Sequence, residues 1–231
     1  MIKQKHSPFR LLVLSLLGLS GLSMVLFGLG MLRGNGWSDW YLIWNLFLAW
    51  IPMVLAYALV VHTRKKEWSS WLGIVLTLTW MIFLPNSFYM VSDYIHLEDM
   101  ARGSVLFDAL TFTCFVFNGL ILGYVSLYMI QSLLRNRVSR LYNELFVATM
   151  LFLSSFAIYL GRDLRWNSWD ILVNPAGILF DVSERIIDPL GHPEAFSTTA
   201  IFFVFLAGLY WVMIHMVRAI GDYARSRQQW P

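Results

Sequence analysis

Apolar residues occur along the chain in six long stretches that more polar connections separate. A run of about 20 apolar residues spans the hydrocarbon core of a bilayer as an α-helix. Lipid offers no partner for backbone polar groups, so a helix is the natural structure for each stretch. The pattern therefore predicts an all-α, polytopic transmembrane bundle of six helices, over residues 11–32, 41–61, 71–91, 105–130, 144–160 and 199–217.

The composition supports a membrane protein and leaves little chain for anything else. Of the 231 residues, 58% are hydrophobic and 13% are charged, against about 45–50% and 25% in soluble domains. Six spans use up this length, so we expect one integral membrane domain over residues 1–231. The first stretch has 22 residues, which is longer than the roughly 7–15 of a signal-peptide core. We therefore expect it to be a membrane helix.

Positive charge alternates from one side of the predicted bundle to the other. The N-terminus, the 64–66 turn, the 135–140 turn and the C-terminus carry 12 of the 17 Lys and Arg residues, three each. The positive-inside rule then makes both termini cytoplasmic, and we expect an inner-membrane protein. Of the 14 acidic residues, 11 fall on the outer side. The small net charge of +3 is therefore the sum of a basic side and an acidic side of the predicted bundle.

Several partner and cofactor classes are excluded or disfavoured. The single cysteine, Cys114, lies within the fourth stretch and rules out an intrachain disulfide and a Cys-based zinc site. The basic residues of the cytoplasmic side stand in short juxtamembrane turns, where they meet anionic headgroups. We therefore expect membrane lipids as partners and no nucleic acid. The sequence contains no P-loop, nucleophile elbow or HExxH motif, and we expect no cofactor and no bound metal.

The third stretch ends in a polar segment that follows Pro85. Proline lacks the amide donor and clashes with the preceding turn, so we expect the third helix to be broken at Pro85. Asn86, Ser87 and Ser92 could satisfy the freed backbone groups, which is the structural interpretation. The functional interpretation is that the break forms the floor of a polar pocket.

Asp93 and His96 follow, three residues apart, and share one face of a continuing helix. This spacing suits an acid–base pair, because His titrates near neutral pH and a carboxylate can orient its ring. It also suits half a metal site, but zinc sites normally use three or four ligands. Asp93 and His96 are therefore the catalytic candidates. Asp93 would otherwise face the membrane surface unpaired, so we expect it to meet Arg162 and Arg165.

The fifth stretch leaves the membrane through a segment rich in Arg, Asp and Trp. If its helix continues past Gly161, then Arg162, Arg165, Trp166 and Trp169 share one face. Interfacial anchoring is one interpretation, because Trp and Arg both favour the headgroup region. The other is that the paired arginines bind a phosphate or carboxylate in bidentate fashion. The ligand-binding candidates are Asn86, Tyr89, Arg162, Asp163, Arg165, Trp166, Asn167, Trp169 and Asp170.

The apolar segment within residues 171–180 is too short to cross a bilayer. It is expected to be either re-entrant or surface-lying on the outer leaflet. Asp181, Glu184, Arg185 and Asp188 follow it and are expected to form a solvated face.

The segment Leu-Pro-Asn-Ser-Phe-Tyr-Met-Val-Ser-Asp-Tyr-Ile-His-Leu at residues 84–97 resembles the LPNxxYxxxDxxHL motif of a bacterial membrane family, domain of unknown function 1361. The Gly-Arg-Asp-Leu-Arg-Trp-Asn-Ser-Trp-Asp block at residues 161–170 resembles the second motif of that family. The resemblance runs from about the second span to the sixth and implies a multi-pass membrane protein without an assigned activity. The matching positions are Pro85, Asn86, Tyr89, Asp93, His96, Arg162, Asp163, Arg165, Trp166, Asn167, Trp169 and Asp170.

Three functions stay open at this point. The protein would bind or move an anionic lipid-like ligand in an outer pocket, or catalyse a reaction on a lipid-linked substrate with Asp93 and His96 as acid and base. The third is a non-catalytic membrane scaffold.

The orientation can be tested with reporter fusions. Fusions after Lys66 and Arg140 are expected to report a cytoplasmic location, and fusions near Gly103 and Pro189 an extracytoplasmic one, because of the distribution of Lys and Arg. Alkaline phosphatase and fluorescent-protein reporters at each site give opposite signals. A reversed pattern at two of the four sites would contradict the topology.

Overall fold

A computed structural model describes residues 8–35, 37, 39–99 and 105–227. The described residues form helices joined by short connections and contain no strand. Six of these helices are long and apolar enough to cross a membrane: Phe9–Arg33, Trp40–His62, Trp71–Tyr94, Val105–Leu134, Arg140–Asp163 and Pro193–Ser226. The predicted all-α architecture with six spans is confirmed, while its orientation stays a prediction.

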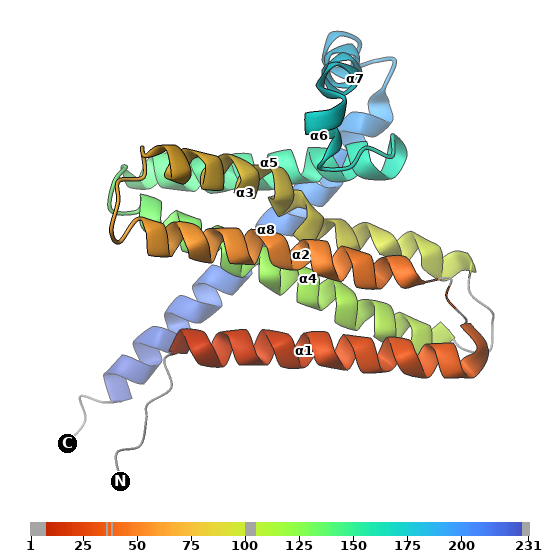
Figure 1. The fold of residues 1–231 in the computed structure, drawn as a ribbon, viewed down its shortest axis with the longest axis horizontal. Helices are drawn as coiled ribbons and strands as arrows, with labels where there is room; N and C mark the ends of the chain where they lie inside the picture. The colour runs from red at the N-terminus through yellow and green to blue at the C-terminus, as the bar shows by residue number, and fades with distance from the viewer. Residues whose placement is uncertain (1–7, 36, 38, 100–104, 228–231) are drawn as a thin grey trace. The chain divides into compact units, whose positions relative to one another are not determined.

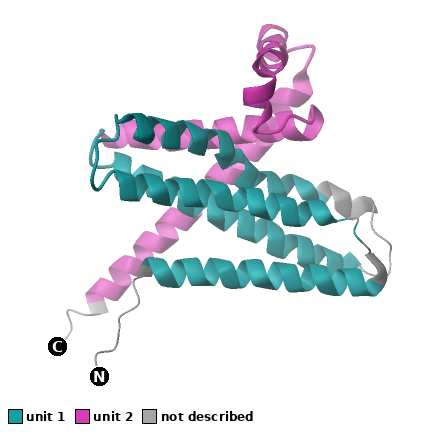
Figure 2. Ribbon diagram, in the orientation of Figure 1, with its two compact units in different colours: residues 1–138 teal, residues 139–231 magenta. Residues whose placement is uncertain are grey.

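The chain divides into two compact units, residues 1–138 and 139–231 (Figure 2). Unit 1 contains α1 (Pro8–Gly30), a π-helical segment η1 (Met31–Asn35), α2 (Trp40–His62), α3 (Trp71–Tyr89), a 3₁₀ segment η2 (Met90–Asp99) and α4 (Val105–Leu134). Unit 2 contains α5 (Arg140–Asp163), α6 (Asp170–Val173), α7 (Pro175–Ile187) and α8 (Pro193–Arg227). The single membrane domain expected over residues 1–231 stays a prediction.

In unit 1, α2 packs against both α3 and α4, and α4 also packs against α1 and η2. Buried polar side chains join these helices. Trp80 Nε1 donates to Ser126 Oγ over 2.6 Å, Ser87 Oγ donates to the Ala49 carbonyl over 3.0 Å, and Asn118 Nδ2 donates to Ser20 Oγ over 2.8 Å. Such bonds are expected between membrane helices, because an unpaired polar group is costly away from water.

The predicted break at Pro85 is wrong in its position. The α-helix continues through Pro85 as far as Tyr89, and the change to 3₁₀ geometry comes at Met90. The ribbon of residues 71–99 nevertheless changes direction along its length (Figure 1). Asn86 Nδ2 donates to the Phe83 carbonyl, two residues before the proline, over 3.1 Å.

Two glycines let α3 and η2 approach the backbone of α4. A Cβ atom on Gly119 would lie 2.5 Å from the Ser87 carbonyl oxygen and 2.8 Å from Met90 Sδ. A Cβ atom on Gly123 would lie 2.6 Å from the ring of Phe88. Small residues at a helix interface permit such close packing in membranes.

Gly119→Ala is expected to lower the free energy of unfolding by about 1–3 kcal/mol, because the added methyl group meets a backbone carbonyl that cannot move aside. Gly28→Ala is the matched control. Its Cβ atom would have nothing within 4 Å, so the helix propensity of alanine is expected to stabilise α1 by about 0.5–1 kcal/mol. Thermal unfolding of the purified protein in mild detergent measures both. Equal stability of the two variants would contradict the close packing of α3 on α4.

Candidate functional site

The end of α5 differs from the continuing helix that the sequence suggested. The helix stops at Asp163, and Arg165 adopts a left-handed backbone conformation with φ of 61°. The amides of Leu164 and Trp166 both donate to the Leu160 carbonyl, over 3.2 and 3.1 Å. A left-handed residue commonly terminates a helix in this way. Trp166 and Trp169 therefore lie beyond the helix, and the predicted helical face that they share with Arg162 is wrong.

Arg162 and Arg165 are both exposed at this helix end. Arg162 Nε lies 3.8 Å from Asp163 Oδ2, near the outer limit of an ion pair. Within the part of the chain that the structure describes, Arg165 makes no hydrogen bond or ion pair. Two guanidinium groups are thus available at the end of a span, and guanidinium presents paired donors that match phosphate and carboxylate.

Trp166 has a structural partner in α7. Its Nε1 donates to Asp181 Oδ2 over 2.7 Å. The indole also lies against the first turn of α7, because a Cβ atom on Gly177 would lie 2.8 Å from Trp166 Cη2. Asn174 begins this helix: its Oδ1 accepts from the Gly177 amide over 3.1 Å, and Pro175 takes the first helical position. The loop after α5 and the start of α7 are therefore locked together.

Asp170 and Trp169 shape the loop between the arginines and α7. Asp170 Oδ2 accepts from the Asn167 amide over 2.7 Å, which holds the turn closed. Trp169 precedes α6 and keeps 38% of its surface exposed. Of the predicted ligand-binding residues in this block, Trp166, Asn167 and Asp170 hold the loop, while Arg162, Arg165 and Trp169 present exposed surface.

Arg185 of α7 is the residue that sequence reasoning missed. We expected a solvated face, but Arg185 is only 7% exposed. Its Nε donates to Tyr159 Oη over 3.1 Å, and its Nη1 donates to the Asp181 carbonyl over 2.7 Å and to Glu184 Oε2 over 3.3 Å. Burial by itself lowers the pKa of Arg185, but the hydrogen bond to Tyr159 and the negative charges of Asp181 and Glu184 outweigh it and raise that pKa. Arg185 therefore stays charged while buried.

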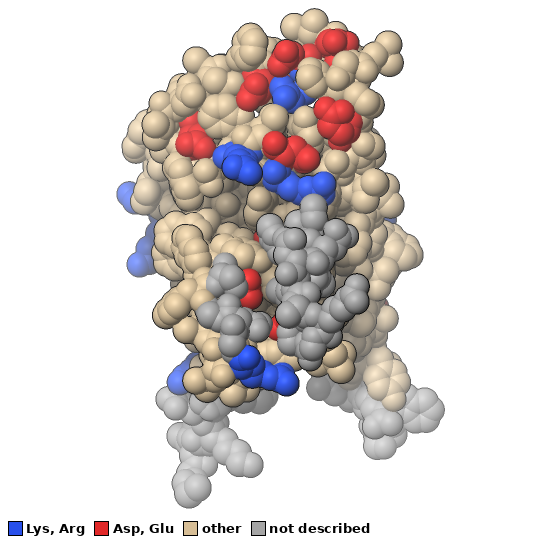
Figure 3. All heavy atoms as spheres, turned by 90° about the vertical axis from the view of Figure 1, so that its right-hand side faces the viewer, with Lys and Arg blue, Asp and Glu red and all other residues tan. Residues whose placement is uncertain are grey.

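Acidic and basic side chains are interspersed over the part of unit 2 that includes α6 and α7 (Figure 3). Asp181 is central to this arrangement, since it accepts from Trp166 and lies 3.6 Å from Arg185 Nη1. The acidic residues of α7 thus serve mainly to compensate the buried guanidinium and to orient the indole.

In unit 1, Asp93 is buried rather than facing the membrane surface. It is 4% exposed, and its Oδ2 accepts from Asn45 Nδ2 of α2 over 3.0 Å. Asp93 therefore has a partner in α2, and the reason for expecting it to pair with Arg162 and Arg165, that it would otherwise be unpaired, does not hold. The side chain of His96 lies outside the described residues. Asp93 belongs to unit 1 and the two arginines belong to unit 2, so the meeting of the two motifs stays a prediction.

The other polar residues of the first motif make local contacts. Asn86 bonds to the Phe83 carbonyl, and Ser92 Oγ donates to the Tyr89 carbonyl over 2.6 Å. Tyr89 is half-buried at the end of α3. The structural interpretation of Asn86 and Ser92 is thus confirmed in part, while Ser87 bonds instead to α2.

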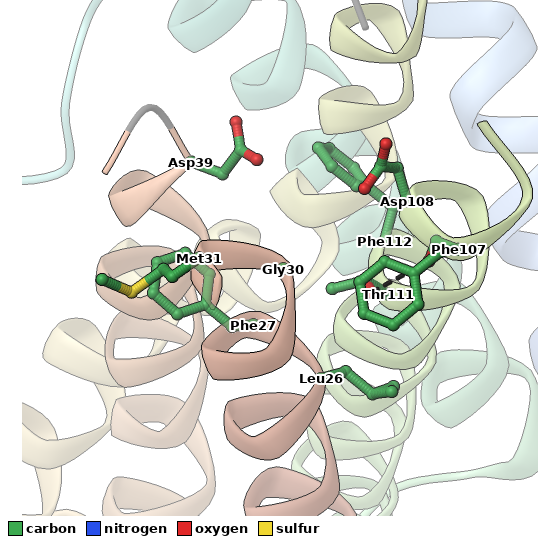
Figure 4. Close-up of a pocket in the computed structure, with 9 residues that line it drawn as sticks. All are labelled: Leu26, Phe27, Gly30, Met31, Asp39, Phe107, Asp108, Thr111 and Phe112. Carbon is green, nitrogen blue, oxygen red and sulfur yellow. Dashed lines mark hydrogen bonds between the residues drawn. The ribbon is translucent and has the colours of Figure 1, made fainter. Parts of the chain in front are cut away.

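A small hollow in unit 1 lies among α1, η1, the start of α2 and α4. Asp39 and Asp108 stand at opposite sides of it (Figure 4). Its cavity volume is about 10 Å³, which is room for about one water molecule and far below the roughly 300–1,000 Å³ of small-molecule sites. Asp39 is the residue that precedes α2, and Asp108 lies in the first turn of α4, so both carboxyl groups stand near a helix N-terminus, where the helix dipole favours negative charge. The hollow is lined by Leu26, Phe27, Gly30, Met31, Asp39, Phe107, Asp108, Thr111 and Phe112.

The residues that the structure describes contain no cluster of three or more His, Cys, Asp or Glu side chains that could bind a metal ion. Within those residues, the end of α5 combines exposed arginines with a loop whose side chains are hydrogen-bonded.

Comparison with known families gives one match. A family described as a protein of unknown function, DUF1361, matches residues 44–215, from α2 to α8. The comparisons with curated proteins and with solved structures gave no match. The resemblance inferred from the two motifs is thereby confirmed.

Replacing Arg185 tests the buried centre of unit 2. Arg185→Ala is expected to lower the free energy of unfolding by about 3–5 kcal/mol, because Tyr159 and Asp181 lose a buried charged partner. Arg225→Ala is the control: Arg225 is exposed and pairs with Asp222 over 2.8 Å, and such pairs contribute about 0–1 kcal/mol. Denaturant unfolding followed by Trp fluorescence measures both. A loss below 1 kcal/mol for Arg185→Ala would refute its central role.

Proposed function

The chain belongs to the DUF1361 family, whose function is unknown, and we propose that it is a membrane protein that binds the phosphate group of an anionic lipid at its outer surface. Arg162 and Arg165 supply the charge, and Trp169 supplies the apolar contact. Six helices that are able to cross a membrane support the location. The proposal concerns the end of α5, where the chain leaves a span.

The observation that carries the proposal is the pair of exposed arginines at this helix end. Arg165 lacks an ion-pair partner among the described residues, and Arg162 has only the distant contact with Asp163. Charge-assisted hydrogen bonds from guanidinium to phosphate are roughly twice as strong as neutral ones. A lipid phosphate lies at the depth where a membrane span ends, which is where these side chains stand.

The backbone of Arg165 strengthens the argument. A left-handed conformation costs an L-residue roughly 1–2 kcal/mol, and glycine is the usual residue at such a helix end. Arginine at this position therefore destabilises the turn relative to glycine, and the turn does not require an arginine side chain. Strain of this kind often marks a functional position.

The hydrogen bonds around the arginines suit a binding site that is preorganised for its ligand. Trp166 is bonded to Asp181, and Asp170 holds the Asn167 amide, so the loop that carries Arg165 has little freedom. Pre-organised groups lose less entropy when they bind. Trp169 keeps an exposed indole next to this loop, and indoles favour the interface between headgroups and acyl chains.

Accessibility favours binding over catalysis. The proposed acid–base pair depends on Asp93, which is buried and bonded to Asn45. The two arginines are exposed and need no rearrangement to meet a lipid.

Substitution of Arg165 tests the proposal. Arg165→Gly and Arg165→Ala are expected to weaken retention of anionic phospholipid roughly ten- to hundredfold, because one charged hydrogen-bonding group contributes about 1.5–3 kcal/mol. Arg165→Lys is expected to lose nearly as much, since an ammonium keeps the charge but not the paired donors. Mass spectrometry of phospholipid per protein, after purification in mild detergent, measures the effect.

Two controls separate binding from folding and from general charge. Arg165→Gly fits the left-handed conformation, so its melting temperature is expected to equal or exceed that of the wild type. Arg140→Ala removes an exposed arginine from the opposite end of α5, where its partner is Glu144 at 2.7 Å, and is expected to retain lipid normally. Equal retention by all Arg165 variants and the wild type would mean that the arginine pair is structural.

A further inference from the structure

Helix α7 carries its apolar side chains on the side that the rest of unit 2 leaves uncovered. Leu179, Phe180, Ile186 and Ile187 are between 67% and 81% exposed. Their spacing of 0, 1, 7 and 8 places them on one face of a helix. The opposite side carries Arg185 and Asp181, which bond to the end of α5 and to the loop after it. The usual arrangement of an amphipathic helix, with its polar side outward, is reversed.

No charged side chain lies within the sector of the helix that these four residues span, and Glu184, which is exposed, stands at its edge. Ser183 lies between the apolar residues, and its hydroxyl donates to the Phe180 carbonyl over 2.8 Å. Its hydrogen bond is therefore satisfied within the helix, as an apolar medium requires. The neighbouring segments continue the apolar surface, because Leu172, Val173 and Leu190 are also strongly exposed.

The contacts of α7 fix its depth. Arg185 Nε reaches Tyr159, which lies one turn before the end of the Arg140–Asp163 span. Trp166, three residues after that span, bonds to Asp181. The inner side of α7 thus lies level with the last turn of a membrane helix. Figure 1 shows α7 close to end-on while α5 is seen from the side, so the two helices run crosswise.

We infer that α7 lies flat in the lipid interface on the side of the membrane where α5 ends, with Leu179, Phe180, Ile186 and Ile187 in contact with acyl chains. A helix of 13 residues is about 20 Å long and does not cross a hydrocarbon core of about 30 Å. A re-entrant path would also place the charged inner side of α7 in the membrane interior. An uncharged, apolar outer face at this depth fits lipid, because interfacial helices bury such a face 5–10 Å deep, at about the boundary of headgroups and chains.

This inference is independent of lipid binding by Arg162 and Arg165. The interfacial position of α7 depends on its own apolar face and on Arg185. It would hold if the arginine pair bound nothing.

Site-directed spin labelling tests the position of α7. The single Cys114 is replaced by Ala, and one cysteine is introduced at Phe180 or at Ile187 of the full chain. Val204, 70% exposed on the apolar α8, is the lipid standard, and Glu67, exposed in the turn before α3, is the water standard. Each labelled protein is reconstituted in vesicles of phosphatidylethanolamine and phosphatidylglycerol. Its collisions with oxygen and with a water-soluble nickel chelate are then measured.

The labels at Phe180 and Ile187 are expected to match Val204, with frequent oxygen collisions and few collisions with nickel. Nickel accessibility equal to that of Glu67 would place the face in water and would overturn the inference. Spin–spin broadening that disappears on dilution with unlabelled protein would place a second copy on the face and would also overturn it. Because these side chains are exposed, each variant is expected to keep the melting temperature of the Cys114→Ala protein.

Discussion

The buried guanidinium of Arg185 is the interaction on which the packing of α7 against α5 depends. It bonds to Tyr159 on α5 and to the Asp181 carbonyl on its own helix, and so joins α7 to the last turn of a span. A buried charge is tolerated only when its hydrogen bonds and counter-charges are in place. Asp181 of α7 is therefore turned inward. The same geometry leaves the apolar residues of α7 outward, an arrangement that suits lipid and not water.

The features that length and hydrophobicity determine could be predicted from the sequence. Each of the six expected stretches lies mostly within a described helix, because a long apolar run has a single solution in lipid. Asn45 and Asn118 bond to Asp93 and Ser20 on other elements of unit 1, as polar residues in membrane helices commonly do. The two motifs were sufficient to identify the family.

The features that depend on local backbone geometry and on tertiary partners could not be predicted. The helical spacing of Arg and Trp residues continues in the sequence past Gly161, but α5 ends because Arg165 adopts a left-handed conformation. Arginine is not a residue that predicts this conformation. Pro85 predicted a break, yet α3 remains helical through Pro85 to Tyr89. Arg185 was expected in solvent, because it lies close in sequence to Asp181, Glu184 and Asp188. Nothing in the sequence indicates that Tyr159 contacts it in the folded chain. The one signal available was the apolar spacing within residues 179–187, which indicates an amphipathic helix with an uncharged face.

The most direct test of this account is an experimental structure of the full chain in a lipid nanodisc, with an antibody fragment bound to increase its size. The account predicts α7 parallel to the bilayer surface, Arg185 in contact with Tyr159, and lipid phosphate density beside Arg162 and Arg165. An α7 that stands in water away from the bilayer, with Arg185 released from Tyr159, would contradict it.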